Sequence, residues 1–121
     1  MAQHNDLGQW GEEVAEEFLR AKGFAILFKN YRTGRLELDL VVQDCPSEIV
    51  IVEVKTRSTV LWQDPISAVN RQKQKHLIRA GHQLLHRLNA VDAAVRFDLI
   101  SVVGTPQDYK VSHIEDAFYP F

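Results

Sequence analysis

The chain has 121 residues, of which 45% are apolar and 25% charged, and its formal net charge is −2. This size fits one globular domain, residues 1–121, which can bury a core without disulfides. Cys45 is the single cysteine, so the chain cannot form an internal disulfide. No apolar run is long enough to span a bilayer, and the N-terminus lacks a secretory pattern. We therefore expect a cytoplasmic protein with no membrane partner.

The charged residues are unevenly distributed along the chain. Between Pro65 and Val91 there is no Asp or Glu, and this stretch holds all of the following basic residues: Arg71, Lys73, Lys75, His76, Arg79, His82, His86 and Arg87. A negative net charge argues against a general nucleic-acid binder. A local basic surface on an acidic chain, however, is what steering a polyanion to one face requires.

The first half of the chain predicts a helix and then three strands. Apolar residues recur at helical spacing from about residue 6 to residue 22, with Asn5 or Asp6 as a cap and Gly23 as a stop. The segments that follow predict, in order, a strand Phe24–Phe28, a turn 30–34, a strand Leu36–Val42, a turn 44–47 and a strand Ile49–Lys55. The short link between the last two strands predicts an antiparallel hairpin.

The second half predicts a loop, a helix and one or two strands. Ser58–Pro65 is expected to form a loop, in which Trp62 stacks on a base, marks a partner surface or covers the core. Residues from about 66 to 89 predict a helix with a leucine-rich stripe, Val95–Val103 predicts a strand, and the tail predicts a short edge strand. The order α-β-β-β-α-β indicates an α/β fold with a mixed sheet flanked by helices.

Charged side chains project from the end of the third predicted strand. Residues two apart on a strand share a face, so Glu53, Lys55 and Arg57 point to the same side. On its own this pattern is more typical of an ordinary charged strand end than of a catalytic site.

Asp39 lies among apolar neighbours in the preceding strand, where an unpaired carboxylate is costly. In a hairpin it lies opposite or diagonal to Glu53, and two such carboxylates repel each other unless a cation lies between them. Mg²⁺ suits that position because it takes few protein oxygens and keeps water and phosphate as its other ligands. The alternative is a structural ion pair between Asp39 and Arg35 or Arg57.

These residues resemble the PD-(D/E)xK nuclease superfamily, which has a restriction-endonuclease-like core. A wider set of short motifs follows the same order along the chain: Gly8-Gln9-Trp10-Gly11-Glu12 with Ala15, Asn30-Tyr31-Arg32, Leu36-Glu37-Leu38-Asp39-Leu40, Val52-Glu53-Val54-Lys55-Thr56-Arg57, Ala68-Val69 with Lys73, and Arg96-Phe97-Asp98-Leu99. With these motifs the chain is similar to the YraN family of small bacterial proteins, which resemble archaeal Holliday-junction resolvases. Leu38 stands where the superfamily often has proline, and Leu36 where the family has glycine; neither change removes a ligand.

The resemblance implies a role for each candidate residue. Asp39 and Glu53 would hold one or two Mg²⁺ or Mn²⁺ ions, and Glu12 would add a ligand, directly or through a bound group. Lys55 would orient the attacking water, help to deprotonate it and stabilise the transition state. By angle alone Glu17 is as eligible as Glu12, and only the resemblance selects Glu12.

Lys73 continues the apolar stripe of the second predicted helix, so it is expected to point toward the sheet near the metal site or a phosphate. The alternative is a lysine that extends past the helix end into solvent. The residues expected to contact nucleic acid are Arg57, Arg71, Lys73, Lys75 and Arg79. The outer basic helix face is equally consistent with a solvated surface, and Arg96 with Asp98 favours a structural ion pair.

The function expected from these patterns is a metal-dependent endonuclease that hydrolyses phosphodiester bonds, on DNA rather than RNA and on branched DNA by analogy. Two alternatives stay open: a nucleic-acid-binding module that does not cut, and a protein-interaction adaptor in DNA processing. A homodimer is expected by analogy with resolvases only.

Overall fold

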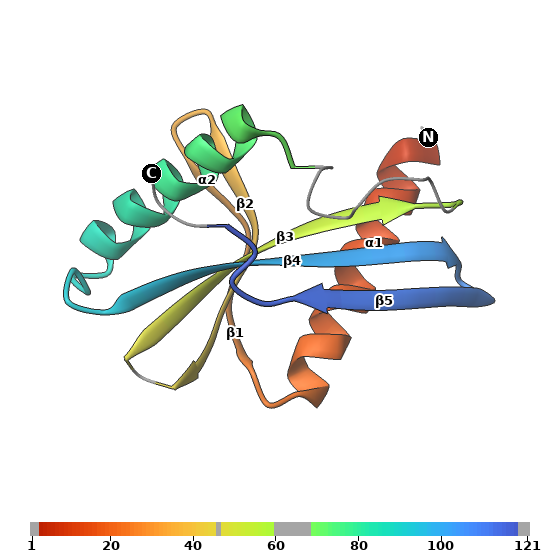
Figure 1. Ribbon diagram of the computed structural model, residues 1–121, viewed down its shortest axis with the longest axis horizontal. Coiled ribbons are helices and arrows are strands. Elements are labelled where there is room, and N and C mark those ends of the chain that lie inside the picture. The colour runs from red at the N-terminus through yellow and green to blue at the C-terminus, as the bar shows by residue number, and fades with distance from the viewer. Residues whose placement is uncertain (1–2, 46, 60–68, 119–121) are drawn as a thin grey trace.

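The computed structural model describes residues 3–45, 47–59 and 69–118. Its elements are α1 (Gln3–Ala21), β1 (Ala25–Thr33), β2 (Leu36–Cys45), β3 (Glu48–Arg57), α2 (Arg71–Arg87), β4 (Ala94–Thr105) and β5 (Asp108–Ile114). The five strands form one sheet in chain order, in which β3 and β4 run parallel and every other neighbouring pair runs antiparallel (Figure 1). The predicted mixed α/β sheet is thus confirmed, with β5 as the edge strand. No helix in the described part of the chain is long and apolar enough to cross a membrane.

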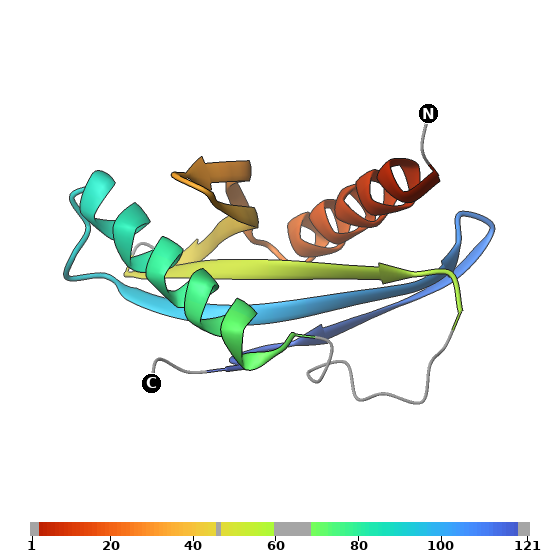
Figure 2. The same cartoon turned by 90° about the horizontal axis from the view of Figure 1, so that it is seen from above.

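The two helices cover opposite faces of the sheet (Figures 1 and 2). Val14, Ala15 and Leu19 of α1 pack on one face against a cluster that includes Val52 and Ile100. On the other face, a second cluster joins the buried side of α2 to β2, β3 and β4 through residues that include Leu77, Ala80, Leu84, Ile51 and Phe97. Alternate residues of the central strands supply the two clusters, as the alternation of side chains along a strand requires. Glu53 shares the parity of Ile51 and therefore lies on the α2 face.

Several boundaries differ from the predicted ones. The predicted turn 30–34 is wrong, because β1 continues to Thr33 and only Gly34 and Arg35 form the turn. Asn30 nevertheless has a positive φ of 50°. The polar residue that suggested a turn is therefore a residue of irregular backbone conformation inside a strand. α1 begins before the predicted cap, with Asp6 in its first turn.

The second helix is shorter than predicted. Its N-cap is Asn70, whose side chain accepts a hydrogen bond from the Lys73 N–H at 2.8 Å, and the helix begins at Arg71. Residues 66–68, predicted to be helical, and Trp62 lie outside the described residues.

Candidate functional site

Asp39 lies where β2 separates from β3. The pairing of these strands places Leu40 opposite Val52, and the next residues toward the start of β2 are not paired with β3. At this point the Val54 N–H donates to Asp39 Oδ2 at 2.9 Å. A carboxylate thus takes the place of a strand carbonyl as acceptor, and the hydrogen bond orients Asp39 toward the end of β3. Neither Arg35 nor Arg57 forms an ion pair with Asp39 among the described residues, so the structural ion-pair alternative is not supported.

Glu53 is a buried carboxylate whose hydrogen bonds and ion pairs only partly offset the cost of burying its charge. Only 4% of the residue is exposed, and its Oε1 atom has no hydrogen-bond partner within the described part of the chain. Burial, followed by the nearby charge of Asp39, raises the pKa of Glu53 to about 8. The ionised form of this pair therefore requires a positive charge that the protein supplies only in part.

Two lysines supply that partial compensation from different elements. Lys55 Nζ lies 3.9 Å and Lys73 Nζ 3.7 Å from Glu53 Oε2. Lys55 follows Glu53 on the same face of β3, as predicted, whereas Lys73 reaches over from the first turn of α2. The structure therefore confirms that Lys73 points toward the sheet and not only past the helix end. Both lysines lower the pKa of Glu53, but less than burial and Asp39 raise it.

Glu12 approaches the same region from α1 on the other side of the sheet. Burial raises the pKa of Glu12 to about 6, with further contributions from the charges of Asp39 and Glu37 and an opposing hydrogen bond from Asn30. Glu17, equally eligible from sequence, is exposed, whereas Glu12 is half-buried and feels the charge of Asp39. Within the described residues, the carboxylates of Glu12, Asp39 and Glu53 do not gather into a ready-made metal-ligand cluster. The structure thus separates the two glutamates, and the irregular Asn30 explains part of how Glu12 is held.

Gly11 sets the position of Glu12, and the sequence reading missed its role. A Cβ atom built on Gly11 would overlap the side chain of Thr56, which follows Lys55 on β3. α1 can lie this close to the sheet only because residue 11 lacks a side chain. The helical periodicity of the sequence gave no indication of this close approach.

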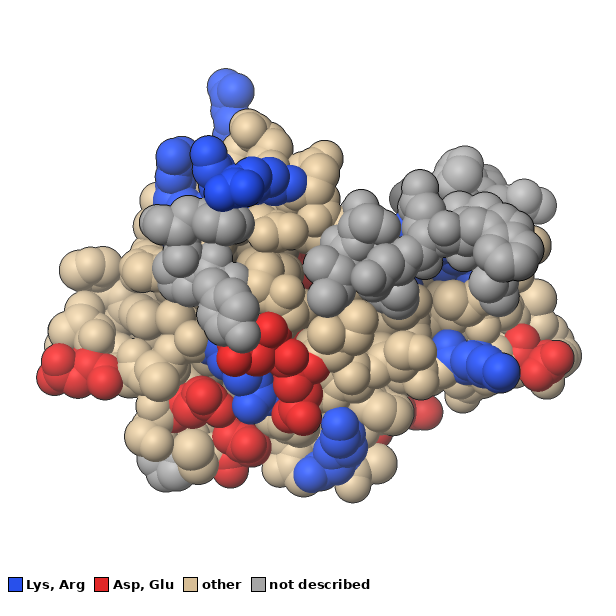
Figure 3. Space-filling model, viewed as in Figure 1, with Lys and Arg blue, Asp and Glu red and all other residues tan. Residues whose placement is uncertain are grey.

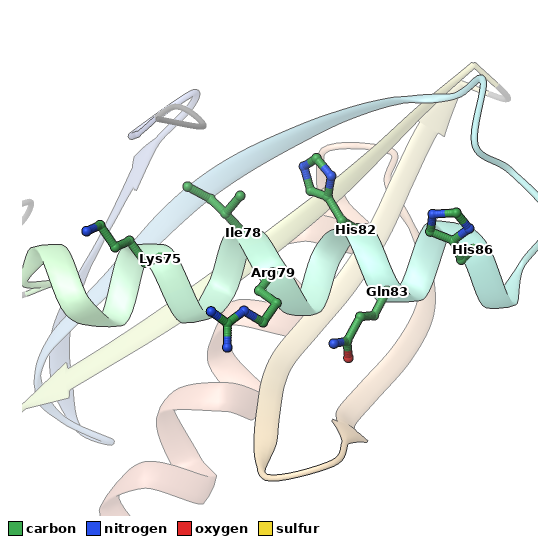
Figure 4. Close-up of a pocket in the computed structure, with 6 residues that line it drawn as sticks. All are labelled: Lys75, Ile78, Arg79, His82, Gln83 and His86. Carbon is green, nitrogen blue, oxygen red and sulfur yellow. The ribbon is translucent and has the colours of Figure 1, made fainter.

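The residues predicted to bind nucleic acid fall into two groups. Lys73 contacts Glu53 in the candidate site. Arg57 is the last residue of β3 and lies two residues after Lys55, so the two side chains share one face of the strand. Lys75 and Arg79 are exposed on the opposite side of α2, where they line a separate hollow (Figure 4). Arg71, at the start of α2, is exposed. The structure therefore does not bring all five predicted residues together.

A second cluster of polar residues lies on the α1 face of β4. Asp98 is fully buried and accepts hydrogen bonds from Arg96 Nε at 2.8 Å and from His113 Nε2 at 2.7 Å. Asp98, His113 and Glu115 have ligand atoms within 4.8 Å of one another and could hold a metal ion. Because the Arg96 guanidinium already occupies both Asp98 oxygens, we interpret this cluster as the predicted ion pair extended by His113. Sequence reasoning missed His113, which lies in the tail strand.

Comparison with known proteins identifies the family of this chain. The model of the uncharacterised protein family UPF0102 matches residues 11–102. The chain belongs to UPF0102, the YraN family. It is 43% identical over 120 residues to the UPF0102 protein of Bacteroides thetaiotaomicron, covering 99% of this chain and 98% of that one. The UPF0102 protein of Flavobacterium psychrophilum is 40% identical over 121 residues, covering both chains completely.

A solved structure with weak likeness is SfsA of Pyrococcus furiosus in complex with Ca²⁺, at 15% identity and a TM-score of 0.39. The match covers 93% of this chain and 63% of that one. UPF0102 is described as uncharacterised, so membership confirms the resemblance to the YraN family and does not assign an activity.

Proposed function

We propose that this protein is a divalent-metal-dependent endonuclease that hydrolyses phosphodiester bonds in nucleic acid. The observation that carries the proposal is the buried Glu53 carboxylate, with one unsatisfied oxygen, beside the oriented carboxylate of Asp39. Two lysines lie within 4 Å of Glu53 and offer positive charge to a phosphate. The preference for DNA over RNA rests on the resemblance to resolvases alone.

The donor set fits Mg²⁺ or Mn²⁺. Carboxylate oxygens are the ligands that these ions prefer, and a cation beside Glu53 Oε1 would satisfy that atom. Asp39 and Glu53 would hold the ion, and Glu12 would contribute from the opposite side, directly or through water. When bound, such an ion screens the phosphate charge and lowers the pKa of a coordinated water.

The lysines complete the proposed chemistry. Lys55, whose Nζ lies 3.9 Å from Glu53 Oε2, would donate hydrogen bonds to a non-bridging phosphate oxygen and orient the attacking water. As the water oxygen bonds to phosphorus, that water would lose a proton to solvent, the ester P–O bond would break, and the leaving oxygen would take up a proton from solvent. Lys73 lies at a similar distance from Glu53 on a different element and would hold the phosphate from the α2 side.

The direct test is hydrolysis of a panel of DNA and RNA structures by purified protein with Mg²⁺ or Mn²⁺. We expect cleavage that requires the metal and that falls by 100-fold or more in Lys55→Ala, about the loss seen when one transition-state donor is removed. Absence of cleavage across the panel, or cleavage that survives Lys55→Ala, would contradict the proposal.

The second candidate is a nucleic-acid-binding module that does not cut, and the exposed basic side of α2 favours it. Salt-dependent binding by a wild-type protein that never cleaves, and equal binding by Asp39→Asn, would support this alternative.

A further inference from the structure

The outer side of α2 carries a row of basic and polar side chains separate from the candidate active site. A hollow of about 470 Å³ is lined by Lys75, Ile78, Arg79, His82, Gln83 and His86. Figure 4 shows these side chains along α2; Ile78 also packs against the buried core, and Gln83 reaches Thr33 of β1. We call this set the outer α2 surface. At about 100° per residue, Lys75 lies on the opposite side of the helix from Lys73, which contacts Glu53.

Among the described residues, no carboxylate forms an ion pair with the cations of this surface. No Asp or Glu occurs between Pro65 and Val91, and neither Lys75 nor Arg79 forms an ion pair with any described residue. On the face seen in Figure 3, Lys and Arg gather over the start of α2 and the hairpin of β1 and β2, and Asp and Glu lie below them. Lys75 and Arg79, which form no ion pair with the described residues, would attract a polyanion to this side of the molecule.

The outer α2 surface is also held in place. Thr33 Oγ1 donates to Gln83 Oε1 at 2.7 Å, and Arg87 Nη1 lies 3.5 Å from the Tyr31 hydroxyl, so the β1–β2 hairpin contacts the C-terminal half of α2. Binding would therefore order few groups beyond the long side chains themselves. This preorganisation lowers the entropy lost on association.

We propose that the outer α2 surface is a second binding surface for the phosphate backbone of nucleic acid, distinct from the Asp39–Glu53 site. Lys75, Arg79, His82 and His86 follow one another at spacings of four, three and four residues and span about 16 Å of helix. A linear row of N–H donors of this length matches several successive phosphates of one strand. The surface faces away from Glu53, so it would hold a different segment from the one at the site.

Other anionic partners fit this surface less well. An interfacial membrane helix must insert an apolar side, and the apolar side of α2 is buried against the sheet. Binding of an acidic protein is an outcome that the test below distinguishes. The proposal depends on the proposed function only in choosing nucleic acid as the polyanion, because binding here needs neither metal nor cleavage.

The test is equilibrium binding of a labelled 20-base-pair duplex in EDTA, at several salt concentrations, by wild type, Lys75→Glu, Arg79→Glu and Lys110→Glu. Lys110 is an exposed lysine on β5, and each substitution replaces +1 by −1, taking the net charge from −2 to −4. Unfolding curves check that each variant is folded.

We expect Lys75→Glu and Arg79→Glu each to weaken binding about eightfold at 0.1 M salt, since one phosphate contact changes the slope of log K against log salt by about 0.9. Lys110→Glu should change affinity by less than twofold. Equal effects of all three variants, no duplex binding at low salt, or tighter binding to anionic vesicles or to an acidic peptide would overturn the proposal. Hydrolysis is measured separately with Mn²⁺, so failure of the second surface and failure of the nuclease proposal are distinguishable.

Discussion

Lys73 Nζ on α2 lies 3.7 Å from Glu53 Oε2 on β3, and this contact joins the helix to the buried carboxylate at the centre of the candidate site. Glu53 carries a pKa of about 8 because burial and Asp39 outweigh the two lysines beside it. The balance of charges around this one side chain is therefore open to direct measurement.

Lys73→Ala should raise the pKa of Glu53 further, because it removes one of the two cations that favour the ionised carboxylate. The measurement is an NMR titration of the Glu53 side-chain carboxyl in metal-free protein. Lys75→Ala is the matched control, since Lys75 lies on the same helix but on its outer side. An unchanged pKa in Lys73→Ala would show that the ion pair does not exist in solution.

The stability of the metal-free protein should fall as pH rises from about 4.5 to about 8. The pKa of Glu53 is higher in the folded protein than its ordinary value of 4.5, so folding favours the protonated form and loses stability as the pH rises toward the folded pKa. Glu12, with a pKa of about 6, acts in the same direction. Denaturant unfolding at several pH values measures this effect.

Glu53→Gln should stabilise the metal-free protein at pH 9 by about 1–3 kcal/mol, because it removes an incompletely paired buried charge. Addition of Mn²⁺ should reverse the order by stabilising wild type and not the variant. A wild type that is more stable than Glu53→Gln at pH 9 without metal would contradict the account of this carboxylate.

Gly11→Ala should destabilise the protein by about 1–3 kcal/mol, since the added methyl group would force α1 away from Thr56. Gly8→Ala is the matched control: it lies on the same helix, a Cβ there meets nothing within 4 Å, and alanine favours a helix over glycine by about 1 kcal/mol. Thermal or denaturant unfolding of both variants checks the prediction. Equal effects of the two substitutions would show that α1 does not press on β3 at this residue.

Asp98→Ala should lower the free energy of unfolding by about 3–5 kcal/mol, because it leaves Arg96 without its principal ion-pair partner. Burial would raise the pKa of Asp98, but hydrogen bonds from His113 and Arg96 lower it below its ordinary value. This carboxylate therefore contributes stability at neutral pH that is lost as pH falls through its folded pKa. Acid unfolding of wild type and Asp98→Ala tests both points. Mn²⁺ binding that depended on Asp98 and not on Asp39 would instead place the metal at this cluster.

Much of the fold follows from local patterns in the sequence. The short link between β2 and β3 predicted a hairpin, and the spacing of leucines predicted the buried side of α2. The turn 30–34 was misplaced because polar residues such as Asn30 signal a turn and an irregular strand residue equally well. The start of α2 was misplaced because Asn70, and not a residue before it, caps the helix.

The site was only partly accessible from sequence for a physical reason. Glu53 and Lys55 share a strand, so their common face follows from parity, and helical spacing placed Lys73 on the inner side of α2. The register between β2 and β3, the hydrogen bond from Val54 to Asp39 and the close approach at Gly11 depend on contacts between distant segments. No local pattern encodes such contacts. The same holds for His113 on β5, whose side chain contacts Asp98 on the neighbouring strand β4.

The central claim is that Asp39 and Glu53 form a divalent-metal site, and calorimetric titration of wild type and Asp39→Asn with Mn²⁺ tests it most directly. Because Glu53 must lose its proton to bind a cation, wild type should bind Mn²⁺ with release of a proton at pH 7. Asp39→Asn should bind at least tenfold more weakly. Equal Mn²⁺ affinity in the two proteins, or no binding by wild type, would contradict the account.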